Sequence, residues 1–299
     1  MSIFKGSGVA LITPFNSDKK VDYDSLSKLI DFHLNNETDA IIVCGTTGEA
    51  STLEDYEHLN VIDFCVSNIN GNIPVIAGTG SNNTNHAIWM SKEAEKIGID
   101  ALLLVTPYYN KATQKGLEEH YKAISKNVDT PILLYNVPSR TGLNMNPRTI
   151  ANIVRDNPNI VGIKEASGNI MQVKQLIKIA KEEGIDIDLY SGNDDDVISV
   201  LDEGGIGVIS VCANIVPRKT HDMVYHYIDG DLKEAKIKQE ELKELSEAIF
   251  SEVNPIPIKN ACYKLGLIQT DELRLPLTKI TKENEKKLVK IMKKQGIIR

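Results

Sequence analysis

Lys164 ends a short apolar run, Val-Gly-Ile-Lys at residues 161–164, that is typical of a buried strand. A lysine in this position is partly removed from water, which lowers its pKa from about 10.4 and leaves more of it as the free amine. Such an amine is a nucleophile whose natural reaction is a Schiff base with a carbonyl compound. Strand alternation puts Gly162 on the same side as Lys164, where a small residue would leave space for a substrate. The alternative is a structural lysine that forms a salt bridge with a neighbour such as Glu165.

A tyrosine and an arginine follow another apolar run. Tyr135 ends the aliphatic residues 132–134 and needs a hydrogen-bond partner for its hydroxyl group. Arg140 lies five residues later in a loop that contains proline and glycine. There it could hold a carboxylate through two parallel hydrogen bonds. A core tyrosine and a surface arginine are the simpler interpretation of each residue taken alone.

Thr46 and Thr47 stand between two glycines in the sequence Gly-Thr-Thr-Gly-Glu at residues 45–49. Their hydroxyl groups and closely spaced backbone N–H groups could bind a small carboxylate. A tight turn from a strand into a helix, with threonine as the N-cap, explains the same residues equally well.

The histidines and cysteines do not form the patterns of a metal site. The six histidines fall mostly within predicted helices, and none belongs to an HxH or HExxH motif or to a His/Cys pair. We therefore expect no metal and no cofactor, which disfavours a zinc-dependent aldolase. The four cysteines lack CxxC spacing and lie within apolar segments, which predicts buried free thiols in a reducing compartment. These cysteines are Cys44, Cys65, Cys212 and Cys262.

Composition disfavours several classes of partner. The 299 residues carry a formal net charge of −7, and aromatic residues are only 5% of the chain. A nucleic-acid or anionic-membrane partner is therefore disfavoured. No apolar stretch approaches the roughly 18 residues that span a bilayer, and residues 1–15 lack the apolar core of a signal peptide. We expect a cytoplasmic protein.

Eight short apolar runs must position these residues, and segments of helical periodicity separate them. Near-continuous apolar strands that alternate with helices indicate a parallel sheet buried on both faces. Eight such units favour an α/β fold of the (β/α)8 TIM-barrel class, and no GxGxxG motif supports an open sheet. Chemistry in such a barrel lies at the C-terminal ends of the strands. The runs begin at residues 9, 40, 74, 101, 132, 161, 187 and 206.

The character of the chain changes after about residue 217. Residues 218–250 and 281–294 have helical periodicity and many lysines and glutamates, and no further strand-like run follows. The prolines of residues 254–258 predict a break between helices. We expect a barrel domain over residues 1–224 and a small all-helical domain over residues 225–299.

Four motifs at the ends of predicted strands together resemble those of a known family. This is the dihydrodipicolinate synthase and N-acetylneuraminate lyase family, whose members are class I, Schiff-base aldolases that act on pyruvate. The resemblance spans essentially the whole chain and implies a lyase. The motifs are Gly-Thr-Thr-Gly-Glu at 45–49, Pro-Tyr-Tyr-Asn at 107–110, Tyr-Asn-Val-Pro-Ser-Arg-Thr-Gly at 135–142 and Gly-Ile-Lys-Glu-Ala-Ser at 162–167.

The resemblance implies a role for each matching residue around pyruvate. Lys164 would form the imine. Thr46 and Thr47 would hold the carboxylate of pyruvate, and Thr46 would also join Tyr135 in a proton relay.

Three further matches concern the subunit interface and the backbone of the site. Tyr109 matches a relay tyrosine that the family donates across a subunit interface. This implies an oligomer, typically a homotetramer built as a dimer of dimers. Gly192 and Ile209 match positions whose backbones line the pyruvate site.

Arg140 separates the branches of the family. Synthase-like members carry an arginine here that receives the carboxylate of L-aspartate-4-semialdehyde, whereas lyases of sialic acid lack it. Arg140 and the Tyr108–Tyr109 pair thus favour condensation of pyruvate with this aldehyde, the first committed step of diaminopimelate and lysine synthesis. The alternative is a retro-aldolase for N-acetylneuraminate or a 2-keto-3-deoxy sugar acid. A barrel that has lost catalysis and only binds is disfavoured, because Lys164, Tyr135 and Thr46 are all present.

One position departs from the members that lysine inhibits. These commonly carry a carboxylate where this chain has His86, so a counter-charge for the amine of bound lysine would be absent. We therefore expect weak or absent inhibition by lysine. The lysine-binding positions of such members match Ala50, Ser51, His58, Asn82 and Tyr108.

Overall fold

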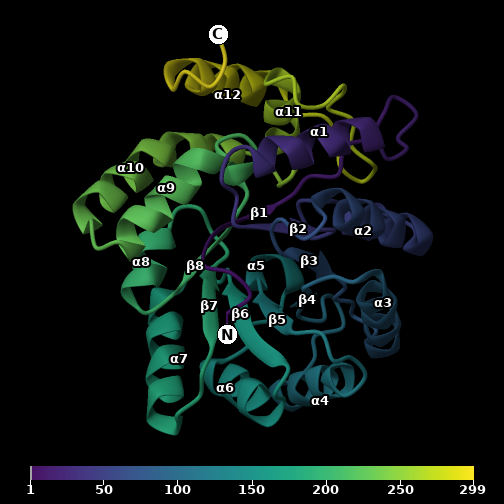
Figure 1. The fold of residues 1–299 in the computed structure, drawn as a ribbon, viewed down its shortest axis with the longest axis vertical. Coiled ribbons are helices and arrows are strands. Elements are labelled where there is room, and N and C mark those ends of the chain that lie inside the picture. The colour runs from purple at the N-terminus through teal and green to yellow at the C-terminus, as the bar shows by residue number, and fades with distance from the viewer. Residues whose placement is uncertain (1) are drawn as a thin grey trace.

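The computed structural model describes residues 2–299, and eight parallel strands close into a barrel at its centre (Figure 1). Each strand pairs with the next along the chain, and β8 pairs with β1. Every predicted apolar run overlaps a strand, so the predicted (β/α)8 TIM barrel is confirmed. The strands are β1 (Gly6–Ala10), β2 (Ala40–Val43), β3 (Val75–Gly78), β4 (Ala101–Val105), β5 (Ile132–Asn136), β6 (Ile160–Glu165), β7 (Asp188–Ser191) and β8 (Gly207–Ser210).

Helices between the strands cover the outside of the barrel. Polar side chains define several of their starts: Asp22, Asn83 and Asn169 each accept a hydrogen bond from a first-turn N–H group. A short helix, α5 (Pro138–Thr141), lies in the loop that follows β5. The outer helices are α1 (Tyr23–Leu34), α2 (Asp55–Ile69), α3 (Thr84–Ile97), α4 (Gln114–Ser125), α6 (Pro147–Asp156), α7 (Ile170–Glu183), α8 (Val197–Asp202) and α9 (Pro217–Ile228).

The first strand begins at Gly6, three residues before the predicted apolar run. The start of this strand was not predicted, because its first three residues are glycine and serine and interrupt the apolar pattern. A Cβ on Gly8 would lie 2.7 Å from Ile42 Cδ1 and 2.9 Å from Phe4 Cζ, so these larger neighbours fill the barrel at this point. The Phe4 ring also stacks on Tyr190 at 4.4 Å between ring centroids. The barrel interior is therefore a packed core.

The predicted space beside Gly162 is not present. A Cβ on Gly162 would lie 2.3 Å from the carbonyl oxygen of Asp188 on the neighbouring strand β7. Glycine at this position allows the two backbones to approach closely and leaves no room for a substrate.

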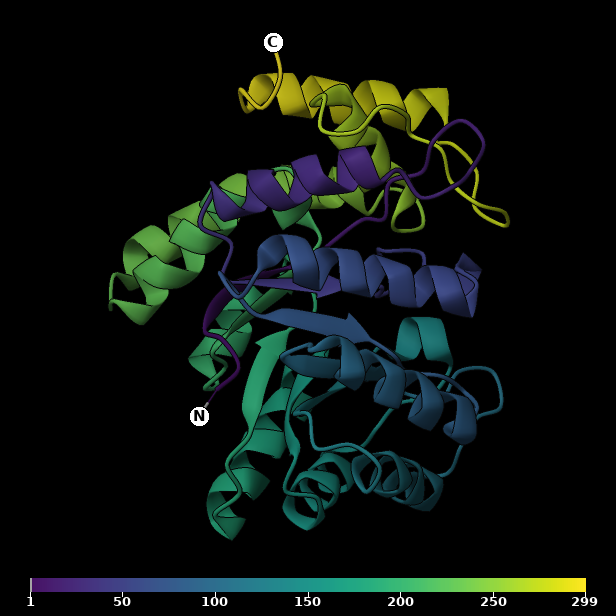
Figure 2. The ribbon, with the colours of Figure 1, turned by 45° about the vertical axis from the view of Figure 1, so that its right-hand side comes forward.

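Three helices follow the barrel: α10 (Leu232–Ile249), α11 (Ile256–Lys264) and α12 (Lys282–Lys294). In both views α11 and α12 lie beside α1 (Figures 1 and 2). The predicted helix break is wrong for residues 256–258, because α11 begins at Ile256. Pro257 lies in the first turn of α11, where a helix does not need the backbone N–H group. The domain boundary expected after residue 224 falls inside α9 and stays a prediction.

All four cysteines are buried and free, as predicted. Within residues 2–299, no helix is both long enough and apolar enough to cross a membrane.

Candidate active site

A cavity of about 190 Å³ lies at the C-terminal ends of the barrel strands. Its walls come from loops and strand ends that are far apart in the sequence. Most of the predicted site residues lie around this one cavity, as expected for a TIM barrel. The predicted residues that line it are Lys164, Tyr135, Thr46, Thr47, Arg140 and Gly192.

Lys164 is the nucleophile candidate, and its side chain is almost wholly buried at the end of β6. Burial lowers its pKa to about 8; the charge of Asp194 opposes this shift and the charge of Arg140 adds to it. At pH 7 roughly a tenth of such a lysine is the free amine, far more than for a lysine in water. Its Nζ lies 4.5 Å from the centroid of the Tyr135 ring.

Glu165 does not form the salt bridge that was the structural alternative for Lys164. Its carboxylate accepts hydrogen bonds from Asn136 Nδ2 at 3.0 Å, Gln172 Nε2 at 3.2 Å and Ser167 N at 2.7 Å. Successive side chains of a strand point to opposite faces, so Glu165 faces away from the cavity that Lys164 lines. The amine of Lys164 is therefore free of a carboxylate on its own strand.

Asp194 supplies the negative charge near Lys164, and sequence reasoning missed it. It is buried, and it accepts hydrogen bonds from Ser210 Oγ, from Val211 N at 2.9 Å and from Cys212 N at 3.2 Å. Burial raises the pKa of Asp194, and these hydrogen bonds oppose the rise. The run of three aspartates that begins at the third residue after β7 was the signal that could have identified it.

Tyr135 lines the cavity next to Lys164, with which it pairs in register across β5 and β6. Burial raises its pKa, and both the charge of Arg140 and a hydrogen bond with Thr46 partly offset the rise. The phenol is therefore protonated at neutral pH and can donate a proton inside the cavity. This suits a general acid or one member of a proton relay.

A chain of hydrogen bonds joins the two candidate carboxylate-binding elements. Arg140 Nη2 donates to the carbonyl oxygen of Asn254 at 3.3 Å, and Asn254 Nδ2 donates to Thr47 Oγ1 at 3.0 Å. Asn254 itself lines the cavity and is 5% exposed. Nothing local in the sequence marks this residue, because it lies 207 positions from Thr47 and belongs to the C-terminal segment.

The loop of residues 45–49 is a compact turn rather than a helix cap. Glu49 N donates to Thr46 O at 3.1 Å, and Thr13 Oγ1 donates to Gly48 O at 2.7 Å. The 3₁₀ turn that follows has Glu49 at its N-cap position, and α2 has Glu54 there. The alternative interpretation of Thr46 or Thr47 as a helix N-cap is therefore wrong.

Two predicted residues do not line the cavity. Tyr109 is 89% exposed and lies in the loop after β4, with its backbone N–H bonded to Thr141 O at 3.4 Å. Ile209 packs inside the barrel, and the cavity wall at this point comes from Val211.

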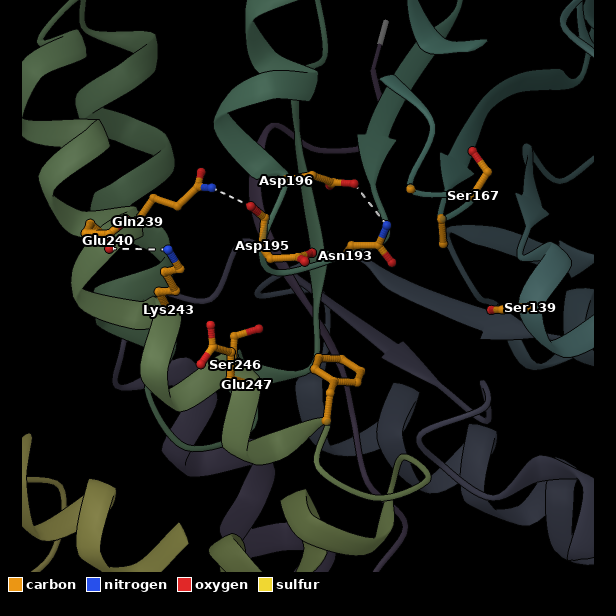
Figure 3. A pocket seen from close by; sticks show the side chains of 13 residues that line it. Ser139, Ser167, Asn193, Asp195, Asp196, Gln239, Glu240, Lys243, Ser246 and Glu247 are labelled. Atoms are coloured by element: carbon orange, nitrogen blue, oxygen red, sulfur yellow. Dashed lines mark hydrogen bonds and ion pairs between the residues drawn. The ribbon is translucent and has the colours of Figure 1, made fainter. Parts of the chain in front are cut away.

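A wider polar pocket of about 800 Å³ adjoins the cavity, with α10 as one wall (Figure 3). The two hollows share lining residues, which are Ser139, Ala166, Asn193 and Phe250. Gln239 on α10 bridges this wall to the loop after β7, because its Nε2 donates to Asp195 O at 2.6 Å (Figure 3). The narrow cavity around Lys164 thus adjoins a wider pocket, several of whose lining side chains are polar or charged.

The arrangement supports one type of chemistry best. It combines a buried amine, a protonated phenol, hydroxyl groups and a guanidinium around a small volume. These groups fit amine catalysis on a small carbonyl compound that also carries a carboxylate. Within residues 2–299, no three His, Cys, Asp or Glu side chains are arranged to hold a metal ion.

Comparisons with known proteins give the same family along the whole chain. Residues 3–295 match the sequence model described as the dihydrodipicolinate synthetase family. A relative from Caldicellulosiruptor bescii, named 4-hydroxy-tetrahydrodipicolinate synthase, is 53% identical over 297 residues, which are 99% of each chain. A relative of the same name from Caldicellulosiruptor saccharolyticus is 54% identical over 297 residues, again 99% of each chain. The solved dihydrodipicolinate synthase of Thermotoga maritima has a TM-score of 0.97 and 40% identity, and covers 99% of this chain and 100% of that chain.

The rate of imine formation at Lys164 should rise with pH and level off near pH 8. Burial lowers the pKa of this amine to about 8, and only the unprotonated form attacks a carbonyl. Below the plateau, each unit of pH should change the rate about tenfold. The protein is mixed with pyruvate between pH 6 and 10, quenched with borohydride, and the adduct is quantified by mass. A rate that still rises tenfold per unit above pH 9 would contradict the lowered pKa.

Proposed function

The chain belongs to the dihydrodipicolinate synthetase family, and we propose that it works as a 4-hydroxy-tetrahydrodipicolinate synthase. This enzyme is a lyase that condenses pyruvate with L-aspartate-4-semialdehyde in the biosynthesis of diaminopimelate and lysine. The observation that carries the proposal is the buried Lys164 amine in a cavity that also contains Tyr135 and Arg140. The same set disfavours the sugar-acid lyases, because a polyol chain does not need the fixed cation of Arg140.

Pyruvate binds first in the proposed mechanism. Thr46 and Thr47 hold its carboxylate, and the free amine of Lys164 attacks the C2 carbonyl carbon. The resulting carbinolamine loses water to give the imine, with Tyr135 donating the proton that the departing hydroxyl needs. Loss of a methyl proton then converts the imine to an enamine, whose terminal carbon is the nucleophile for the next step.

L-Aspartate-4-semialdehyde binds second, with its carboxylate on Arg140. The enamine carbon attacks the aldehyde carbon, and the alkoxide that forms takes up a proton. The amine of the same substrate then attacks the imine carbon and displaces Lys164. This transimination closes the ring, releases the product and restores the free lysine.

The proposed active form is an oligomer in which Tyr109 completes the proton relay of a neighbouring subunit, typically within a homotetramer. Its exposure supports this role, because Tyr109 is 89% exposed in the single chain and lies outside the cavity. Gly192 contributes backbone to the pyruvate site, whereas Ile209, of which the same was expected, packs in the barrel core and does not line the cavity.

A cytoplasmic location is consistent with the four free cysteines of the chain. Four buried cysteines without a disulfide are typical of proteins from reducing compartments. The partners we propose are the two small substrates and further copies of this chain, with no nucleic acid and no membrane.

Borohydride trapping tests the proposed function directly. Incubation with pyruvate and borohydride should add the mass of reduced pyruvate to the peptide that contains Lys164, and the trapped enzyme should be inactive. The Lys164→Ala variant should show neither adduct nor turnover, because Lys164 is the one lysine among residues 2–299 that lines the cavity. Consumption of pyruvate is then measured with L-aspartate-4-semialdehyde as the second substrate. No adduct at any lysine of the wild type would overturn the mechanism.

The Arg140→Met variant should lose affinity for the second substrate. Removal of the guanidinium should raise KM for L-aspartate-4-semialdehyde about tenfold to a hundredfold, since a hydrogen-bonded charge pair contributes about 1.5–3 kcal/mol. Trapping with pyruvate should persist. Arg148→Met is the matched control, because Arg148 lies on α6 and pairs with Glu183 away from the cavity. An unchanged KM for the aldehyde in Arg140→Met would remove this arginine from substrate recognition.

Inhibition by lysine should be weak. This position carries an imidazole in place of a carboxylate, and the nearby Asp55 carboxylate is already engaged by it, with Oδ1 3.0 Å from His86 Nε2. Initial rates are measured with lysine up to 10-fold above the pyruvate concentration, and little loss of rate is expected. The His86→Glu variant is the companion measurement and should gain sensitivity. Strong inhibition of the wild type at submillimolar lysine would contradict the expectation.

A further inference from the structure

A buried ion pair joins the C-terminal segment to the loop that carries Thr46 and Thr47. Lys259 on α11 binds Glu49 Oε1, and the side chains of both residues are almost wholly inaccessible to solvent. Glu49 is the last residue of the loop of residues 45–49. The two partners are 210 positions apart in the sequence, so the pair exists only in the complete fold.

Further contacts surround this ion pair. The second carboxylate oxygen of Glu49 accepts a hydrogen bond from the backbone N–H of Arg274 at 3.2 Å. The Arg274 guanidinium binds both oxygens of Glu57 on α2, at 2.6 and 2.7 Å. The cationic groups of Lys259 and Arg274 lie 3.9 and 4.4 Å from the centroid of the Phe15 ring. The carboxylate of Glu49 is therefore held from two directions.

The backbone at Glu49 is strained, with a φ of +53° in the left-handed region. A residue other than glycine keeps this conformation only where its surroundings determine it. Here the surroundings are Lys259 and Arg274, which fix the side chain. The strained residue lies two positions after Thr47, so its conformation sets the direction in which the loop leaves the cavity.

Stability alone is a poor reason for such a pair. Burial of two charges costs more than burial of apolar side chains of the same size, and replacing a buried ion pair by a hydrophobic pair is often neutral or stabilising. Burial also lowers the pKa of Lys259 to about 8, against the opposing effect of Glu49. A role in fixing the geometry of the neighbouring loop accounts for the pair better.

We propose that Lys259 is a positioning residue for pyruvate: through Glu49 it holds the loop of residues 45–49 so that Thr46 and Thr47 face the Lys164 amine. Asn254 supports the same loop through its hydrogen bond to Thr47. This inference rests on the proposed function, because it assigns pyruvate to the two threonines. Lys259 itself does not line the cavity and acts only through Glu49.

The Lys259→Met variant tests the inference, since methionine keeps the length of the side chain and removes the charge. The pyruvate concentration that gives half-maximal borohydride trapping should rise about tenfold, because misplaced binding groups lose affinity steeply with distance. The KM for L-aspartate-4-semialdehyde should stay within about twofold. A merely structural residue would lower the amount of folded enzyme and leave both of these constants unchanged.

Lys264→Met is the matched control. Lys264 lies on the same helix and is paired with Glu285 at 2.6 Å, but it does not contact the loop. The pyruvate concentration that gives half-maximal trapping of the Lys264→Met variant should equal that of the wild type. Circular dichroism and thermal unfolding confirm that each variant is folded before the kinetics are compared.

Glu49→Gln is the second variant, and it decides the question if Lys259→Met does not fold. It keeps the shape of the side chain and removes the charge that Lys259 binds. The pyruvate concentration that gives half-maximal trapping should therefore rise, as for Lys259→Met. A folded variant in which this concentration is unchanged, or failure of both variants to fold, would assign the pair to stability and overturn the positioning role. Failure of the proposed function is a separate result, because the wild type itself would then not be trapped by pyruvate.

Discussion

The amine of Lys164 is held out of water at the end of β6, and its pKa is set by that burial together with the charges of Asp194 and Arg140. Burial favours the free amine, Asp194 favours the ammonium form, and Arg140 favours the free amine again. The balance leaves a pKa of about 8, low enough for a useful fraction of nucleophile at neutral pH. Arg140 thus acts in two ways: its charge helps to lower the pKa of Lys164, and it offers a fixed cation to a carboxylate.

The site is assembled from one rigid part and one part that needs outside support. Tyr135 and Lys164 lie on adjacent strands in direct register, and behind them Asn136 and Glu165 are hydrogen-bonded on the outer face of the barrel. The reacting groups are therefore fixed by the sheet itself. Thr47 lies instead in a loop, where its position depends on partners from the C-terminal segment. A site built on loops reaches catalytic precision only when such supports are present.

The sequence could predict what depends on local pattern, and it failed where distant segments meet. Strand-length apolar runs identified the barrel, because parallel strands are buried on both faces. A lysine at the end of such a run pointed to the buried amine that lines the cavity. Gly162 was misread, because the backbone of Asp188 that fills the space beside it belongs to another strand. Asn254 was missed for the same reason, since its contact with Thr47 spans 207 positions.

The exposed loop after β4 has the features of a segment organised for a partner. Tyr109 has a φ of +73° and is 89% exposed. Such a backbone persists only where contacts impose it, and these come from Asn82 and Asn110: Asn82 Nδ2 donates to Tyr108 O at 3.1 Å, and Asn110 Nδ2 donates to Asn82 O at 2.9 Å. In the single chain, Tyr109 therefore has a strained backbone and an exposed side chain that does not pack in the core. This conformation supports the proposed oligomer, in which the Tyr109 ring would enter the site of a neighbouring subunit.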